Sequence, residues 1–347
     1  MSTLERFSLG VLGFSTLHHS RPNPQSALHR AAYTATERHW RGYTDTTDED
    51  LVRLTECGGP EAAWVTAVPG RPEHRLSNEA WRDSFSLRLA VPLGFLANGP
   101  QGCDCHAQFD RTSREIAAGV RTAPSRRRDR PKQVDALGEH DQRCPRSFTL
   151  VRHDHVQDTV RGELRYGGKN AKPATVHELR SRDMRDTSMT KGDLRATNMS
   201  TDGLHTVIDF GITHSLLDTY IRAIKSKVER GYGADRYDQK KVRHYHKIMD
   251  EKDLHGHLHY RSFTLGTFGS FGKSAWKIID EVCDSDHPHA LDDFNSWRDP
   301  DPRRRFILSV GFALQRGNSR MLRQADRRRS GTRYRGRRSG VDVARAA

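Results

Sequence analysis

Two aspartates near the middle of the chain are the residues whose type and spacing indicate chemistry. Asp193 comes directly before a short candidate strand, and Asp209 lies inside the β-branched run 206–213. A charged residue in such an apolar run is costly to bury unless it is paired or binds a metal. Two carboxylates converging from adjacent strands would form an oxygen site of the kind that Mg²⁺ prefers, as in a metal-dependent phosphodiesterase. The alternative is one turn aspartate and one edge-strand aspartate without a shared role.

A second group of residues has the chemistry of a zinc site. Cys103 and Cys105 form a C-x-C pair, and His140 and Cys144 form an H-x₃-C pair. Three thiolates and one imidazole would complete a tetrahedral Cys₃His site, with His106 as a substitute ligand. The gap between the two pairs is longer than in most zinc modules, so unrelated cysteines beside a surface histidine remain the alternative.

The charge of the chain indicates an acidic polymer as partner. The sequence has 347 residues and a formal net charge of +14, with 58 Lys and Arg against 44 Asp and Glu. Nucleic acid is the first expectation and a membrane surface the second, although basic tails can also serve only solubility. The segment between the two cysteine pairs contains Arg126, Arg127 and Arg128 and almost no apolar residue. It is predicted to be a flexible basic loop that contacts phosphates or remains solvated.

Compartment and membrane features follow from what the sequence lacks. No apolar run approaches the length that a bilayer requires, and the N-terminus has no secretory signal pattern. Five cysteines form no even disulfide ladder, which favours a reduced, intracellular environment.

Helical spacing predicts the elements that would position these groups. One helix is expected over 148–164, with Arg152 and His153 in its first turn, where they could meet a phosphate. Further helices are expected over 59–69, 76–89, 215–230, 235–249, 274–282 and 304–322, and a strand over 260–269.

The order of these motifs resembles the region downstream of the polymerase in non-LTR (LINE-type) retrotransposon proteins. The matching features, over roughly residues 57–325, are the Cys/His pairs, Arg152-His153-Asp154, Gly192-Asp193, Val207-Ile-Asp209, Lys241-x₃-Tyr245, Thr264-Leu-Gly-Thr-Phe-Gly and Leu314-Gln-Arg-Gly-Asn-Ser. In that family, a zinc knuckle is followed by a restriction-like endonuclease that nicks target DNA to prime reverse transcription.

The resemblance implies roles for individual residues. Asp193 and Asp209 would hold Mg²⁺, and Lys241 with Tyr245 would match the lysine–tyrosine helix of the family. Lys225, Lys227 and Lys240 stay open as alternatives to Lys241. Cys103, Cys105, His140 and Cys144 would bind zinc, and Arg152 and His153 would lie on the DNA face. The partners would be DNA and element RNA, and the location would be nuclear.

Two departures from the family pattern concern the acidic motif itself. Gly192 stands where a proline is usual, and Phe210 and Gly211 follow Asp209 in place of an Asp-x-Lys tripeptide. Because no polymerase domain precedes the motifs, the chain is expected to be a truncated copy, active or inactive as a nuclease. A non-catalytic nucleic-acid-binding zinc-knuckle protein and an inert pseudogene product are the alternatives.

Together these inferences predict an α+β protein with a restriction-endonuclease-like mixed sheet flanked by helices. The predicted divisions are an irregular segment 1–50, a helical region 51–165 with the zinc knuckle and a basic insertion at 111–135, a nuclease domain 166–322 and a disordered Arg-rich tail 323–347.

Overall fold

A computed structural model describes residues 47–58, 60–65, 67, 71–96, 102–103, 132–144, 147–174, 192–224, 229–251, 253–283 and 301–330. Predictions for residues 1–46, for most of the basic insertion and for residues 331–347 lie outside the described residues.

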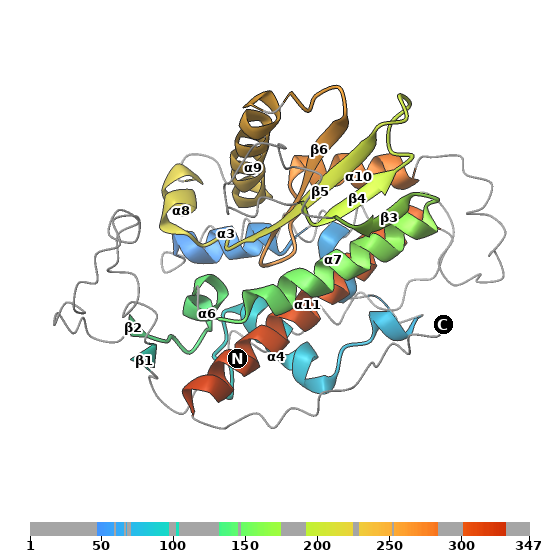
Figure 1. The fold of residues 1–347 in the computed structure, drawn as a ribbon. Helices are drawn as coiled ribbons and strands as arrows, with labels where there is room; N and C mark the ends of the chain where they lie inside the picture. The colour runs from blue at the N-terminus through green and yellow to red at the C-terminus, as the bar shows by residue number, and fades with distance from the viewer. Residues whose placement is uncertain are drawn as a thin grey trace.

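A four-stranded mixed sheet forms the frame of the site (Figure 1). Its strands lie in the order β3 (Asn170–Pro173), β4 (Leu194–Thr197), β5 (His205–Thr213) and β6 (Leu258–Gly266). The first three are antiparallel neighbours, whereas β6 runs parallel to β5. Because parallel neighbours need a long crossover, the chain passes through α8 (Asp218–Ile224) and α9 (Tyr232–Glu251) between them. The predicted mixed sheet with flanking helices is confirmed.

Helices cover both faces of this sheet (Figure 1). Alternate residues of β5 face opposite sides, so Ile208 and Phe210 enter the main core while Val207 faces α9. The main core also contains residues of α7 (Thr149–Tyr166), α10 (Lys273–Cys283) and α11 (Pro302–Arg329). On the opposite face, Tyr245 and Met249 of α9 pack against Val207 and against Leu258 and Tyr260 of β6. Asp209, two residues after Val207, therefore lies on the α9 side.

The long helix α11 extends further than its sequence predicts. Asp301 caps its start and Pro302 occupies the first turn. The predicted disordered tail from residue 323 is wrong for its first seven residues, because α11 continues to Arg329. Ala325 is buried there, and the Arg329 guanidinium makes two hydrogen bonds to the Asp141 carboxylate, at 2.6 and 2.8 Å. Packing and this buried ion pair hold a segment whose composition alone resembles a solvated tail.

The N-terminal elements pack onto the same structure. They are α3 (Asp48–Glu56), the 3₁₀ turns η1 (Pro60–Val65) and η2 (Pro72–His74), and α4 (Asn78–Leu89). Trp64 of η1 packs against Leu308 and Phe312 of α11. The buried Glu56 carboxylate accepts hydrogen bonds from Gly231 N–H (2.9 Å), from Ser215 Oγ (3.0 Å) and from Ser270 Oγ. These contacts tie α3 to the loops around the sheet.

The predicted division between residues 165 and 166 does not match the packing. Val156, Val160 and Leu164 of α7 belong to the same core as the strands. Among the described residues, no helix is both long and apolar enough to cross a membrane.

Candidate functional site

Asp193 and Asp209 meet at the junction of β4 and β5. Asp193 N–H donates to Ile208 O at 3.0 Å, which extends the ladder just before β4 begins. The Asp193 carboxylate in turn accepts a hydrogen bond from Phe210 N–H at 2.7 Å. The side chains of Asp193 and Asp209 are close enough for each to affect the pKa of the other. The structure thus brings together the two carboxylates that the strand pattern singled out.

Helix α9 brings Lys241 onto this pair. The Lys241 ammonium forms an ion pair with Asp209 Oδ2, and the two side chains are only 16% and 9% exposed. Gly211 permits this approach, since a Cβ at that position would lie 2.4 Å from Tyr237 Cε1 and 2.7 Å from Lys241 Cε. Of the other candidate lysines, Lys240 is exposed and lies outside this ion pair, while Lys225 and Lys227 lie outside the described residues.

Two tyrosines close the site on the α9 side. The rings of Tyr245 and Tyr260 stack with their centroids 4.1 Å apart, and Tyr260 Oη donates to Asp209 Oδ2 at 3.5 Å. Burial and the nearby carboxylates raise the pKa of both phenols, so both remain neutral donors at neutral pH. Tyr245 was expected here, whereas Tyr260 was not. No local pattern in the sequence indicates Tyr260, which the parallel pairing of β6 with β5 places opposite Val207.

His153 and Gln157 of α7 hold the side chain and the backbone of Asp193. His153 Nε2 lies 3.1 Å from Asp193 Oδ2, and Gln157 Nε2 donates to Asp193 O at 2.9 Å. Burial lowers the pKa of His153, but hydrogen bonds and charge from Asp193 and Asp154 outweigh that effect and raise it. The structure therefore places His153 in contact with the acidic pair, where it orients Asp193.

The two aspartates differ in acidity because their surroundings differ. Burial raises the pKa of Asp209 to about 6, although Lys241 acts in the opposite direction, and the charge of Asp193 adds to the rise. For Asp193, the penalty of burial is outweighed by hydrogen bonds and charge from His153 and by Phe210 N–H, so its pKa is lowered. Such separation of two neighbouring acids is common at catalytic carboxylate pairs.

The structure does not support the predicted phosphate-contacting role of Arg152. Its side chain is buried and donates to Gln142 Oε1 and, at 3.1 Å, to Asn318 Oδ1. Burial lowers the pKa of this guanidinium to about 10, which still leaves it charged at neutral pH. Gly317 lets α11 lie against it, because a Cβ there would be 2.7 Å from Arg152 Cα. Arg152 thus ties α7 to α6 (Glu139–Arg143) and α11, and neighbouring His153 turns toward the site instead.

We expect Arg152→Met to lower the free energy of unfolding by about 2–3 kcal/mol, because charged hydrogen bonds to Gln142 and Asn318 are lost. Retention on DNA at low temperature should be unchanged. Arg161→Met on the same helix removes only a half-exposed pair with Asp158 and should cost less than about 1 kcal/mol. Denaturant unfolding and DNA retention measure both effects. Weakened DNA retention at unchanged stability would show that Arg152 is a surface contact after all.

Three of the four predicted zinc ligands also come together. One ligand atom each from Cys103, His140 and Cys144 lies within 4.8 Å of the others, and all three residues are buried. The two Sγ atoms are 3.6 Å apart, close to the roughly 3.8 Å expected for two sulfurs bound about 2.3 Å from a tetrahedral zinc. Cys105 and His106 lie outside the described residues, as do Arg126, Arg127 and Arg128.

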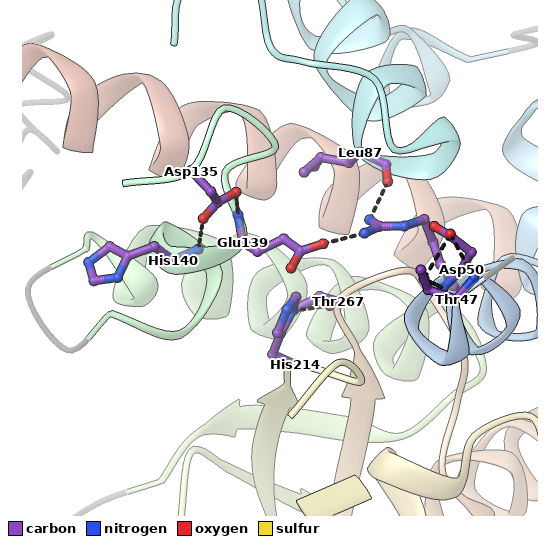
Figure 2. Close-up of polar contacts among 9 residues, drawn as sticks. Thr47, Asp50, Leu87, Asp135, Glu139, His140, His214 and Thr267 are labelled. Carbon is purple, nitrogen blue, oxygen red and sulfur yellow. Dashed lines mark hydrogen bonds and ion pairs between the residues drawn. The ribbon is translucent and has the colours of Figure 1, made fainter. Parts of the chain in front are cut away.

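The helix that carries His140 is fixed from both sides. Asp135 accepts hydrogen bonds from the N–H groups of Glu139 (2.8 Å) and His140 (2.7 Å) at the start of α6 (Glu139–Arg143), and the His140 ring points away from that carboxylate (Figure 2). The Glu139 side chain reaches in the opposite direction and pairs with Arg53 of α3, which also donates to Leu87 O at 2.9 Å (Figure 2). Both sets of contacts preorganise the ligand helix.

Packing explains the glycine at position 192. A Cβ on Gly192 would lie 2.1 Å from Val207 Cγ1, a distance that atoms do not adopt. Val207 belongs to the cluster between β5 and α9. With Val207 present, any larger residue before Asp193 would push apart the strands that bring Asp193 and Asp209 together.

A comparison with protein-family models and a comparison with curated proteins each found no match for this chain.

Proposed function

We propose that this protein is a metal-dependent DNA endonuclease domain of retrotransposon type that nicks DNA. The observation that carries the proposal is one largely buried site in which the Lys241 ammonium pairs with Asp209 and the Asp193 carboxylate lies beside Asp209. Carboxylates that share a site with a lysine and with neutral phenols are suited to phosphodiester hydrolysis. The motif order resembling non-LTR retrotransposon proteins and the net charge of +14 favour DNA as the substrate.

The donor set fits Mg²⁺. This cation binds through one or two carboxylates, keeps several waters and completes its shell with substrate phosphate, so Asp193 and Asp209 suffice. When bound, the metal would neutralise phosphate charge and make a bound water more acidic.

The residues of the chain would position the metal-binding carboxylates and stabilise the charge on the reacting phosphate. His153 and Phe210 N–H hold Asp193 in place, as their contacts at 3.1 and 2.7 Å indicate. Lys241 would balance the negative charge that develops on the phosphate and orient the attacking water. Tyr245 and Tyr260 form the wall behind Asp209 and limit its contact with bulk water.

We further propose that Cys103, His140 and Cys144 hold a structural zinc ion, with Cys105 as the fourth ligand. The sulfur separation and the burial of the three donors support this assignment. The ion would join the strand pair β1 (Gly102–Cys103) and β2 (Lys132–Gln133) to α6.

The acidity of Asp209 predicts a pH dependence of metal binding. Its pKa of about 6 lies above the ordinary value of 3.8, so the folded, metal-free protein holds this proton up to a higher pH than the unfolded chain does. The stability that this proton contributes is present below about pH 4 and is lost as pH rises through about 6. Since Mg²⁺ requires the ionised carboxylate, its affinity should fall about tenfold per pH unit below pH 6. Calorimetric Mg²⁺ titrations between pH 5 and 8 measure this, and a flat affinity over that range would contradict the assigned acidity.

The proposed function is tested by incubating supercoiled DNA with the purified full chain in Mg²⁺ and in chelator. We expect nicked circles only with Mg²⁺, with ends carrying a 3′-hydroxyl that a polymerase can extend. Retention of DNA without nicking would instead support the alternative, a non-catalytic nucleic-acid-binding protein. If the chain neither nicks nor retains DNA, an inert product is the remaining candidate.

A further inference from the structure

Helix α9 carries a basic stripe beside the proposed site. The stripe consists of five exposed residues at helical spacing: Arg236, Lys240, Arg243, His244 and Lys247. At 100° per residue, they fall within about a third of the helix circumference. Lys241 and Tyr245 lie to one side of the stripe, on the part of the helix that faces β5 and β6. One helix therefore contributes a lysine to the acidic pair and presents positive charge to solvent next to it.

The stripe is available for an external partner. Within the described part of the chain, the Arg236 guanidinium donates to the neutral Gln239 side chain at 3.4 Å, and Arg243 Nε donates to Gln239 O at 3.2 Å. Lys247 faces Glu251 at 3.7 Å with both side chains exposed, a pair that contributes little and is easily exchanged. The exposed acids of the same helix, Asp250 and Glu251, lie at its C-terminal end, so the charge of the stripe is uncompensated by its own helix from Arg236 to Arg243.

We infer that this α9 stripe binds the phosphate backbone of duplex DNA whose scissile phosphate lies at Asp193 and Asp209. The inference rests on the proposed function and deepens it by assigning the surface that holds the duplex. From Arg236 to Lys247 the helix rises about 16 Å, which corresponds to roughly five base pairs of DNA. Lys241 lies near the middle of that length, so the backbone contacts are centred on the nick and extend two to three base pairs on either side.

The geometry of α9 is rigid enough for this purpose. The absence of a side chain on Gly211 lets Tyr237 and Lys241 lie directly against β5. On the buried side of the same helix, Asp238 accepts hydrogen bonds from Ser274 Oγ (2.6 Å) of α10 and from Ser262 Oγ of β6. The stripe thus keeps a fixed position relative to the acidic pair.

The salt dependence of DNA binding tests the inference. In chelator, the affinity of the full chain for a 30-base-pair duplex is measured by fluorescence anisotropy between about 50 and 200 mM salt. Each phosphate contact contributes about 0.9 to the slope of log K against log salt. Replacing Arg236, Lys240, Arg243 and Lys247 together by Gln should make the slope shallower by about 3.6 and weaken binding at low salt at least 100-fold.

Two matched variants keep the test specific. A quartet of exposed cations on other elements, Arg75→Gln, Arg82→Gln, Lys277→Gln and Arg304→Gln, removes the same charge and should leave the slope nearly unchanged. A charge-preserving α9 quartet with Arg and Lys exchanged should retain the steep slope. Thermal unfolding shows that each variant folds.

Equal effects of the two neutralised quartets, or no DNA binding by the unmodified chain, would overturn the inference. Nicking separates it from the proposed function. If the unmodified chain nicks DNA but the neutralised α9 quartet has an unchanged salt slope, only the assignment of the stripe as the DNA-binding surface is wrong. If the quartet has a shallower slope but the unmodified chain shows no Mg²⁺-dependent nicking, only the proposed endonuclease activity is wrong.

Discussion

Replacing Asp209 by Ala should lower Mg²⁺-dependent nicking by about 10³-fold while DNA retention stays within about twofold of the unmodified chain. Asp209 is the carboxylate that both Lys241 and Tyr260 contact, and its charge interacts with that of Asp193. Removing a metal-binding carboxylate removes several kcal/mol of charge stabilisation, and about 4 kcal/mol corresponds to 10³ in rate. The comparison is made as single-turnover nicking with protein in excess over DNA.

The matched control is Asp202→Asn. Asp202 is an exposed aspartate in the turn between β4 and β5, where it pairs with His259 at 2.7 Å. Its substitution should leave the nicking rate unchanged. Asp209→Asn preserves size and should lose as much rate as Asp209→Ala, because an amide oxygen carries no charge. Equal nicking by the Asp209 variants and the unmodified chain would remove Asp209 from the reaction.

Replacing Cys144 by Ser should release zinc and destabilise the region around α6. Cys144 belongs to the buried group with Cys103 and His140. An ion held at 1,000 times its dissociation constant contributes about 4 kcal/mol, so the variant should lose about that much stability. Elemental analysis should find about one zinc per chain before the substitution and less than about a tenth after it. Calorimetric melting with and without chelator measures the stability change.

Cys283→Ser is the control for this prediction. Cys283 ends α10 and lies outside the Cys/His group. Its substitution should leave zinc content unchanged and cost at most about 1 kcal/mol. A purified chain without stoichiometric zinc, or with equal zinc after Cys144→Ser, would show that the three donors are not a zinc site.

Local patterns in the sequence predicted much of the sheet and the acidic pair. The β-branched, apolar run around Asp209 favours a strand, and a charge inside it indicates a partner. The four-residue spacing of Lys241 and Tyr245 places them on one side of a helix, which is α9 in the structure. These features depend on neighbours in the sequence, so they could be read without the fold.

Features that depend on long-range packing could not be predicted. Arg152 and His153 are adjacent, and only the approach of α11 decides that Arg152 is buried while His153 meets Asp193. Tyr260 comes from a strand 51 residues after Asp209, and parallel pairing alone brings it to the site. The last two turns of α11 likewise depend on the ion pair between Arg329 and Asp141.

The most direct test of the central claim compares three forms of the full chain on supercoiled DNA in Mg²⁺: unmodified, Asp193→Asn and Asp202→Asn. The site geometry predicts nicking by the unmodified chain and by Asp202→Asn, and a loss of about 10³-fold in Asp193→Asn, the partner of His153 and Asp209. Nicking by Asp193→Asn at the rate of the unmodified chain, or no nicking by any form while all three bind DNA, would contradict the assignment of an active nuclease site to this carboxylate pair.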